Sequence, residues 1–97
     1  MKVIYHPKAE LELIEAARFY KLMVPNLGTE FLDEVDEAIS DILSAPTRWR
    51  IIEVDIRRYV LRRFPYAVYF RTLPDHLRIL AIKHHSRHPD YWRGRIN

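Results

Sequence analysis

Histidines and tyrosines gather in the last third of this 97-residue chain, where they could move protons around a phosphate group. Three of the five histidines lie between residues 84 and 88, and Tyr91 follows shortly after them. An imidazole titrates near neutral pH, so one side chain can accept a proton while another group returns one. Cleavage of RNA by its own 2′-hydroxyl needs such a base and acid, with cations around the phosphate.

Arginines before the histidine cluster could supply those cations. In a strand, Arg58 and Arg62 would share one sheet face because their spacing is even, and Arg57 and Arg63 would lie on the other face. A guanidinium group presents planar donors that match two oxygens of a phosphate. Tyr59, Tyr66 and Tyr69, which lie among and just after these arginines, could in addition stack on bases.

Together these residues form a candidate nuclease site that needs no metal. We assign His85 as the base, Tyr91 as the acid, and Arg58 and Arg62 as the phosphate ligands, provided that the tail folds back over the sheet. The histidine spacing matches no established zinc pattern, and Asp90 is the one carboxylate nearby. We therefore expect no bound metal.

The same residues also allow simpler interpretations. An arginine-rich strand can be a solvated face that discourages pairing between sheet edges. A histidine at the end of a strand is often a hydrogen-bonding surface group, and aromatic residues such as Tyr91 and Trp92 commonly anchor a C-terminus in the core. The sequence alone leaves these alternatives open.

The charge is divided unequally along the chain. Residues 46–97 hold 12 Lys and Arg against 4 Asp and Glu, a net +8, whereas residues 1–45 have a net charge of −5. This polarity predicts one surface for an anionic partner, either nucleic acid or an acidic protein.

Length and composition indicate one globular domain spanning residues 1–97. Hydrophobic residues make up 48% of the chain, and the absence of cysteine excludes disulfides and cysteine zinc sites. The longest apolar run, 66–70, is too short to span a membrane. No phosphate-binding loop or dinucleotide fingerprint is present, so we expect a cytoplasmic protein without a cofactor.

Hydrophobic spacing predicts two helices after a short strand at residues 3–5. The first helix begins at Pro7 and ends before a break at residues 25–28, and the second carries an apolar stripe from Phe31 to Ile42 and ends at Pro46. So short a connection predicts an antiparallel helical hairpin.

The pattern changes to strands after Pro46. Residues 58–64, 66–72 and 77–84 are rich in β-branched and aromatic residues and are separated by proline-containing turns. We predict an α+β domain of order β-α-α-β-β-β, with the helical hairpin packed on a small, mainly antiparallel sheet. The tail, residues 89–97, should form one helical turn or stay extended.

At these residues the chain resembles toxins of the RelE/ParE superfamily from bacterial type II toxin–antitoxin, or plasmid stabilisation, systems. The resemblance runs over nearly the whole length. It is carried by the segments Tyr5-His6-Pro7-Lys8-Ala9-Glu10, Leu27-Gly28-Thr29-Glu30-Phe31, Pro46-Thr47-Arg48-Trp49, Arg63-Phe64-Pro65-Tyr66, and His84-His85-Ser86-Arg87-His88-Pro89-Asp90-Tyr91-Trp92.

The resemblance implies a growth-inhibiting protein neutralised by an acidic antitoxin. The long hairpin and His84 favour the ParE branch, whose members poison DNA gyrase. For this reading the expected contacts to target or antitoxin are Arg57, Arg63, His84, Arg87, Trp92 and Arg93.

Two alternatives remain. RelE-like members cut messenger RNA in the ribosome, and His85, Tyr91, Arg58 and Arg62 match their catalytic positions. Against this, the chain has Phe64-Pro65-Tyr66 where such nucleases often carry a catalytic arginine. The second alternative is a degenerate toxin that acts only as a binding module.

Overall fold

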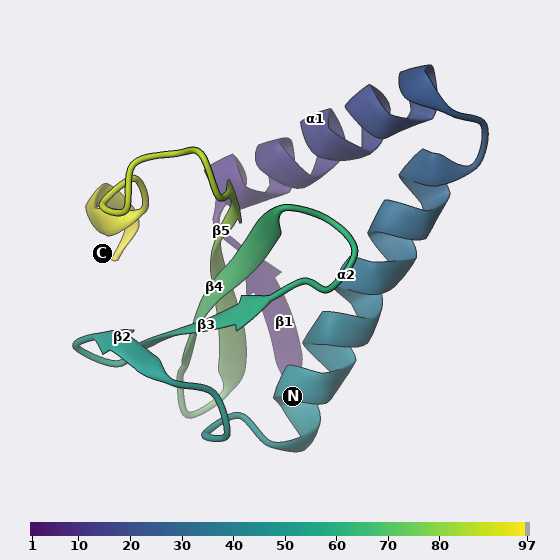
Figure 1. Cartoon of the computed structure of the whole chain (residues 1–97). Coiled ribbons are helices and arrows are strands. Elements are labelled where there is room, and N and C mark those ends of the chain that lie inside the picture. Colours follow the sequence, from purple (N-terminus) through teal and green to yellow (C-terminus); the bar gives the residue numbers. More distant parts are fainter. Residues whose placement is uncertain (97) are drawn as a thin grey trace.

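Two helices cover one face of a five-stranded sheet, and the C-terminal segment lies against the other face (Figure 1). The computed structural model describes residues 1–96. In chain order its elements are β1 (Lys2–Tyr5), α1 (Pro7–Met23), α2 (Leu27–Ser44), β2 (Ile51–Glu53), β3 (Ile56–Val60), β4 (Tyr66–Thr72), β5 (His76–His84) and the 3₁₀ helix η1 (Arg93–Arg95). The predicted α+β class, with a helical hairpin on a small sheet, is confirmed.

Local signals set the start of the hairpin and the turn between its two helices. His6 caps α1, because its imidazole Nδ1 accepts the backbone N–H of Lys8 at 3.1 Å, and Pro7 occupies the first helical position. Between the helices Asn26 adopts a left-handed conformation (φ 72°), which asparagine tolerates better than most residues.

The core lies between the hairpin and the sheet. One stripe of α2 is buried, formed by Phe31, Val35, Ala38, Ile39 and Ile42. Phe31 packs edge-on against Phe64, with ring centroids 5.1 Å apart, and Tyr20 of α1 lies 4.9 Å from the same Phe64 ring. These edge-to-face contacts fix the hairpin against the turn between β3 and β4.

The strand order is β1-β5-β4-β3-β2, and only β1 pairs in parallel, with β5. The pairs β5–β4, β4–β3 and β3–β2 are antiparallel, as the sequence predicted for most of the sheet. Arg58, Tyr69 and Ala81 are neighbours across three strands, and their side chains lie on the face opposite the helices.

The predicted strand 58–64 was wrong at both ends. β3 starts at Ile56 and ends at Val60, so Arg62 and Arg63 lie in the following turn. The Glu34 carboxylate of α2 accepts the backbone N–H groups of both arginines, at 2.7 and 3.2 Å, and so holds these donors away from the sheet. The strand β2 was not predicted, because its three residues are too few for a periodic pattern.

The tail forms a single helical turn, one of the two forms expected for it. η1 spans Arg93–Arg95, and Asn97 lies outside the described residues. Trp92 is 3% exposed and packs on Tyr69 with ring centroids 5.8 Å apart. The tail therefore covers a second, smaller core on the sheet.

Candidate functional site

The residues assigned to a nuclease divide among three separate hollows. His85 and Arg58 line one cavity of about 510 Å³ on the tail side of the sheet, between β3 and the segment after β5. We call it the basic cavity; it is lined by Arg58, Val60, Tyr69, Lys83, His85, Ser86, Arg87, His88 and Pro89. No carboxylate is among these lining residues.

Arg62 lies elsewhere. With Arg63 and Tyr59 it borders a hollow of about 230 Å³ beside the Glu34 and Glu37 carboxylates of α2. Because β3 ends at Val60, the Arg62 side chain does not share a sheet face with Arg58, and this prediction from their even spacing was wrong.

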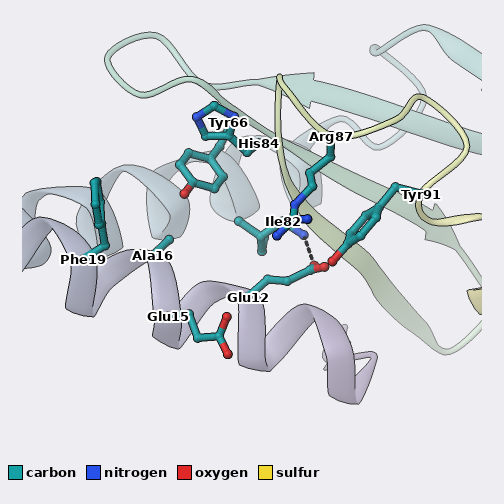
Figure 2. Close-up of a pocket in the computed structure, with 9 residues that line it drawn as sticks. All are labelled: Glu12, Glu15, Ala16, Phe19, Tyr66, Ile82, His84, Arg87 and Tyr91. Carbon is teal, nitrogen blue, oxygen red and sulfur yellow. Dashed lines mark hydrogen bonds between the residues drawn. The ribbon is translucent and has the colours of Figure 1, made fainter.

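Tyr91 lines a third hollow, of about 260 Å³, between α1 and the end of β5. Figure 2 shows its ring turned toward the Glu12 carboxylate, with the Arg87 side chain beside it. The Arg87 guanidinium lies 5.4 Å from the centre of the Tyr91 ring. The predicted base and acid, His85 and Tyr91, therefore face different hollows.

The cations of the basic cavity act on one another. Burial lowers the pKa of His85 below 6.5, and His84, Lys83 and Arg58 lower it further because they oppose another positive charge. A neutral imidazole near pH 7 can accept a proton or a hydrogen bond.

Lys83 is a site residue that was not predicted from the sequence. It is 6% exposed and its ammonium donates a hydrogen bond to the backbone oxygen of His84 at 3.3 Å. Within residues 1–96 no carboxylate forms an ion pair with it. Burial and then Arg58 lower its pKa. The one feature of the sequence that could have indicated this role was a lysine within the otherwise mostly apolar second half of β5, where its neighbours are buried.

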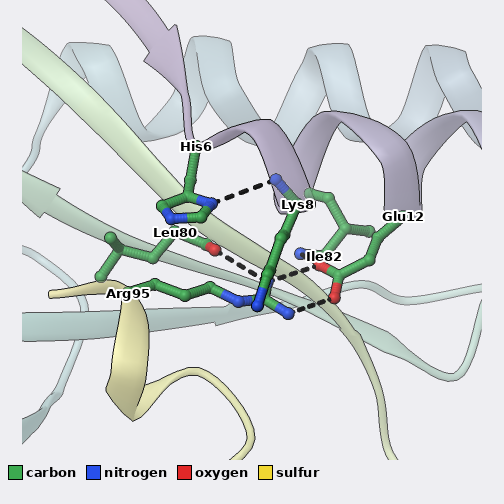
Figure 3. A network of polar contacts seen from close by, with 6 residues as sticks. All are labelled: His6, Lys8, Glu12, Leu80, Ile82 and Arg95. Carbon is green, nitrogen blue, oxygen red and sulfur yellow. Dashed lines mark hydrogen bonds and ion pairs between the residues drawn. The ribbon is translucent and has the colours of Figure 1, made fainter.

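A buried ion pair was missed as well. Arg95 of η1 donates to the Glu12 carboxylate of α1 at 2.7 and 2.9 Å, and the two side chains are 5% and 14% exposed (Figure 3). Arg95 also donates to the Leu80 carbonyl, and Glu12 accepts the N–H of Ile82. This network joins the tail, α1 and β5. It could not be predicted, because no local sequence pattern indicates which residues meet across so large a separation along the chain.

The residues expected to bind target or antitoxin differ in accessibility. Arg57 donates to the backbone carbonyls of Trp49 and Thr47, and Trp92 is buried on the sheet. Arg63 and Arg93 are exposed and form ion pairs with carboxylates of Glu30 and Glu53.

His84 and Arg87 complete that set at the end of β5. His84 packs edge-on against Tyr66 at 5.0 Å, and its Nδ1 accepts the backbone N–H of Ser86. Arg87 is exposed and borders both the basic cavity and the hollow that contains Tyr91. In the described part of the chain, no three His, Asp or Glu side chains gather as a metal site would require, and no helix is long and apolar enough to cross a membrane.

Comparison with known proteins decides the family. Residues 3–89 match the family model of the ParE toxin of the type II toxin–antitoxin system parDE. The chain belongs to the ParE toxin family. The match covers β1 to the loop after β5, including both helices and the whole basic cavity.

A solved structure shares the fold of this toxin. The chromosomal ParDE toxin–antitoxin system from P. aeruginosa contains a chain that superimposes with a TM-score of 0.75 at 22% sequence identity. The alignment covers 87% of this chain and 95% of the other. A search of curated proteins finds no significant match. As a ParE toxin, the protein has an antitoxin as its partner.

Proposed function

We propose that this toxin stops growth by binding DNA gyrase, and that its antitoxin holds it inactive. The observation that carries the proposal is the match to the ParE model over residues 3–89. The separation of His85, Tyr91 and Arg62 into three hollows supports it further, because general acid–base catalysis requires its groups within hydrogen-bond reach of one substrate.

For the contacts, we propose the exposed basic groups around the end of β5 and the tail. Arg87, Arg63 and Arg93 are the accessible members of the predicted set, and two of them would exchange a surface ion pair for a partner carboxylate. Such an exchange costs little because solvent and salt screen the attraction between two exposed charges. Trp92 and Arg57 would act indirectly, by holding the tail and the segment before β2.

The test is pulse labelling of DNA and protein synthesis just after the toxin is induced without its antitoxin. We expect DNA synthesis to stop first, and the purified toxin to block supercoiling by gyrase until antitoxin is added. An early stop in protein synthesis would instead support a ribosome-dependent nuclease. No effect on either would leave a binding module with a toxin fold.

A variant separates gyrase binding from RNA cleavage. We expect the double variant His85→Ala and Tyr91→Phe to remain toxic, because neither proton transfer nor cleavage is part of gyrase binding. If this variant folds normally but loses toxicity together with RNA cleavage in cell extracts, the gyrase proposal is wrong.

A further inference from the structure

We propose that the basic cavity binds a phosphodiester of a DNA strand, with Lys83 at its floor and Arg58 at its side. The proposal concerns contact with nucleic acid itself, and it does not depend on gyrase as the target. The first observation is the burial of Lys83, which is 6% exposed and without a carboxylate partner in residues 1–96.

A buried ammonium without an anion opposes folding, because desolvation favours its neutral form. The Lys83 ammonium uses one donor on the His84 carbonyl and can offer the others to the cavity that it lines. Its pKa is lowered by burial and by Arg58, as expected for a positive charge that lacks a counter-ion. An anion bound in the cavity would stabilise the charged form of Lys83, so it would favour folding and raise the pKa of this side chain.

The neighbouring groups suit a phosphodiester. Arg58 is exposed on the same sheet face, and two of its coplanar N–H donors can meet two oxygens of one phosphate. His85 and Arg87, on the loop after β5, line the same cavity. The cations therefore come from β3, β5 and the following loop and surround one space of about 510 Å³. No acidic side chain among the lining residues would repel an anion.

A nucleic acid fits this arrangement better than an acidic peptide. A DNA strand presents one negative charge at every nucleotide, so cations on separate elements can each meet a phosphate oxygen of the same or the next nucleotide. The half-exposed apolar side chain of Val60 and the exposed ring of Pro89 also line the cavity and provide contact area for sugar and base. A single peptide carboxylate would leave most of these donors unused.

The experiment measures fluorescence anisotropy of a labelled single-stranded oligodeoxythymidine with the purified toxin. We expect Lys83→Met and Arg58→Gln each to weaken binding by about tenfold, the loss typical of one charge-assisted hydrogen bond. The control Arg18→Gln removes the same charge from the exposed surface of α1, which borders the groove between the helices, and should bind as the wild type does.

Two further readouts separate a binding role from a structural one. Each of the two cavity variants should reduce the slope of log affinity against log salt by about 0.7 to 1, because one phosphate contact is lost. Lys83→Met should melt close to the wild type, since the lost contacts with the Tyr69 ring and the His84 carbonyl are offset by removal of a buried charge without a carboxylate partner in residues 1–96.

Two outcomes would overturn the proposal. One is unchanged oligonucleotide affinity in a folded Lys83→Met and in Arg58→Gln. The other is equal competition by polyglutamate of matched charge, which would mean that the cavity takes carboxylates. Either result leaves the gyrase proposal intact, because the assay contains no gyrase.

Discussion

Single side chains in this toxin carry charges whose surroundings differ sharply. Glu12 and Arg95 form an ion pair that is almost removed from water, whereas the Arg93–Glu53 pair lies at the surface, with side-chain exposures of 52% and 35%. Within residues 1–96 Lys83 is buried without a carboxylate partner, and His85 has Lys83 and Arg58 as cationic neighbours. Burial therefore decides what each charge contributes, and the two predictions at this scale test that dependence.

The first prediction compares the buried pair with the exposed one. Glu12→Gln leaves the Arg95 guanidinium buried without a counter-charge, so we expect a loss of about 3–5 kcal/mol in the free energy of unfolding. Glu53→Gln breaks the exposed pair and should cost far less, because solvent and salt screen the attraction between exposed charges. Urea denaturation of both variants checks this, and equal losses would contradict it.

The second prediction concerns the protonation of His85. Its titration, followed by NMR, should have a midpoint below 6.5, and Arg58→Gln should move this midpoint upward because one repelling charge is lost. The pKa of His85 is higher in the unfolded chain, which therefore binds this proton more readily. The contribution of His85 to the free energy of unfolding should accordingly decrease as the pH falls below 6.5. Arg18→Gln is the control and should leave the midpoint in place. A midpoint at or above 6.5 would show that the cationic neighbours do not act on the imidazole.

At the scale of the elements, the close approach of α1 and α2 depends on one glycine. A Cβ at Gly28 would lie 2.5 Å from the carbonyl oxygen of Ala17 and 3.0 Å from Cβ of Lys21. Because the carbonyl belongs to helix backbone, it cannot move aside without shifting α1. The hairpin thus pairs two helices whose separation leaves no room for a larger residue at this position.

We therefore expect Gly28→Ala to destabilise the toxin although alanine favours helices. Overpacking typically costs about 1–3 kcal/mol, and we expect a net loss of about 1 kcal/mol or more in thermal unfolding. Gly94→Ala is the matched control, because a Cβ there meets nothing within 4 Å and should change stability by less than about 0.5 kcal/mol. A Gly28→Ala variant as stable as the wild type would mean that the helices can separate.

At the scale of the whole molecule, the division of charge along the chain matches the division between the helical layer and most of the sheet. The acidic half of the chain, residues 1–45, forms β1 and the helical hairpin, and the basic half forms the rest of the sheet and the tail. Most positive charge therefore lies on β2–β5, the turns between them and the tail, with Arg58, Lys83 and Arg87 lining the basic cavity, while the helices carry most of the carboxylates.

This polarity predicts that the toxin's affinity for its antitoxin falls as salt is added. The expected contacts are exposed arginines, and ions screen such contacts over about 10 Å at 0.1 M ionic strength. Calorimetric titrations across a range of NaCl concentrations measure the effect. A dissociation constant that stays the same across that range would indicate an interface dominated by apolar contacts instead.

The sequence by itself determined the elements and their general arrangement. Apolar spacing along α1 and α2, and β-branched and aromatic runs in β4 and β5, act locally, so they predicted the hairpin and two strands closely. The C-terminal motif around His84 and the charge division likewise indicated the family and its basic surface.

Only the tertiary structure decided which side chains meet. Glu34 holds the N–H groups of Arg62 and Arg63 in a turn, and Glu12 binds Arg95 across a sequence separation of 83 residues. The tail that this ion pair secures lies on the sheet face of Lys83. These contacts depend on how distant segments pack together, and a local pattern contains no information about partners so far away. For this reason the nuclease-like residues were visible in the sequence, but their separation was not.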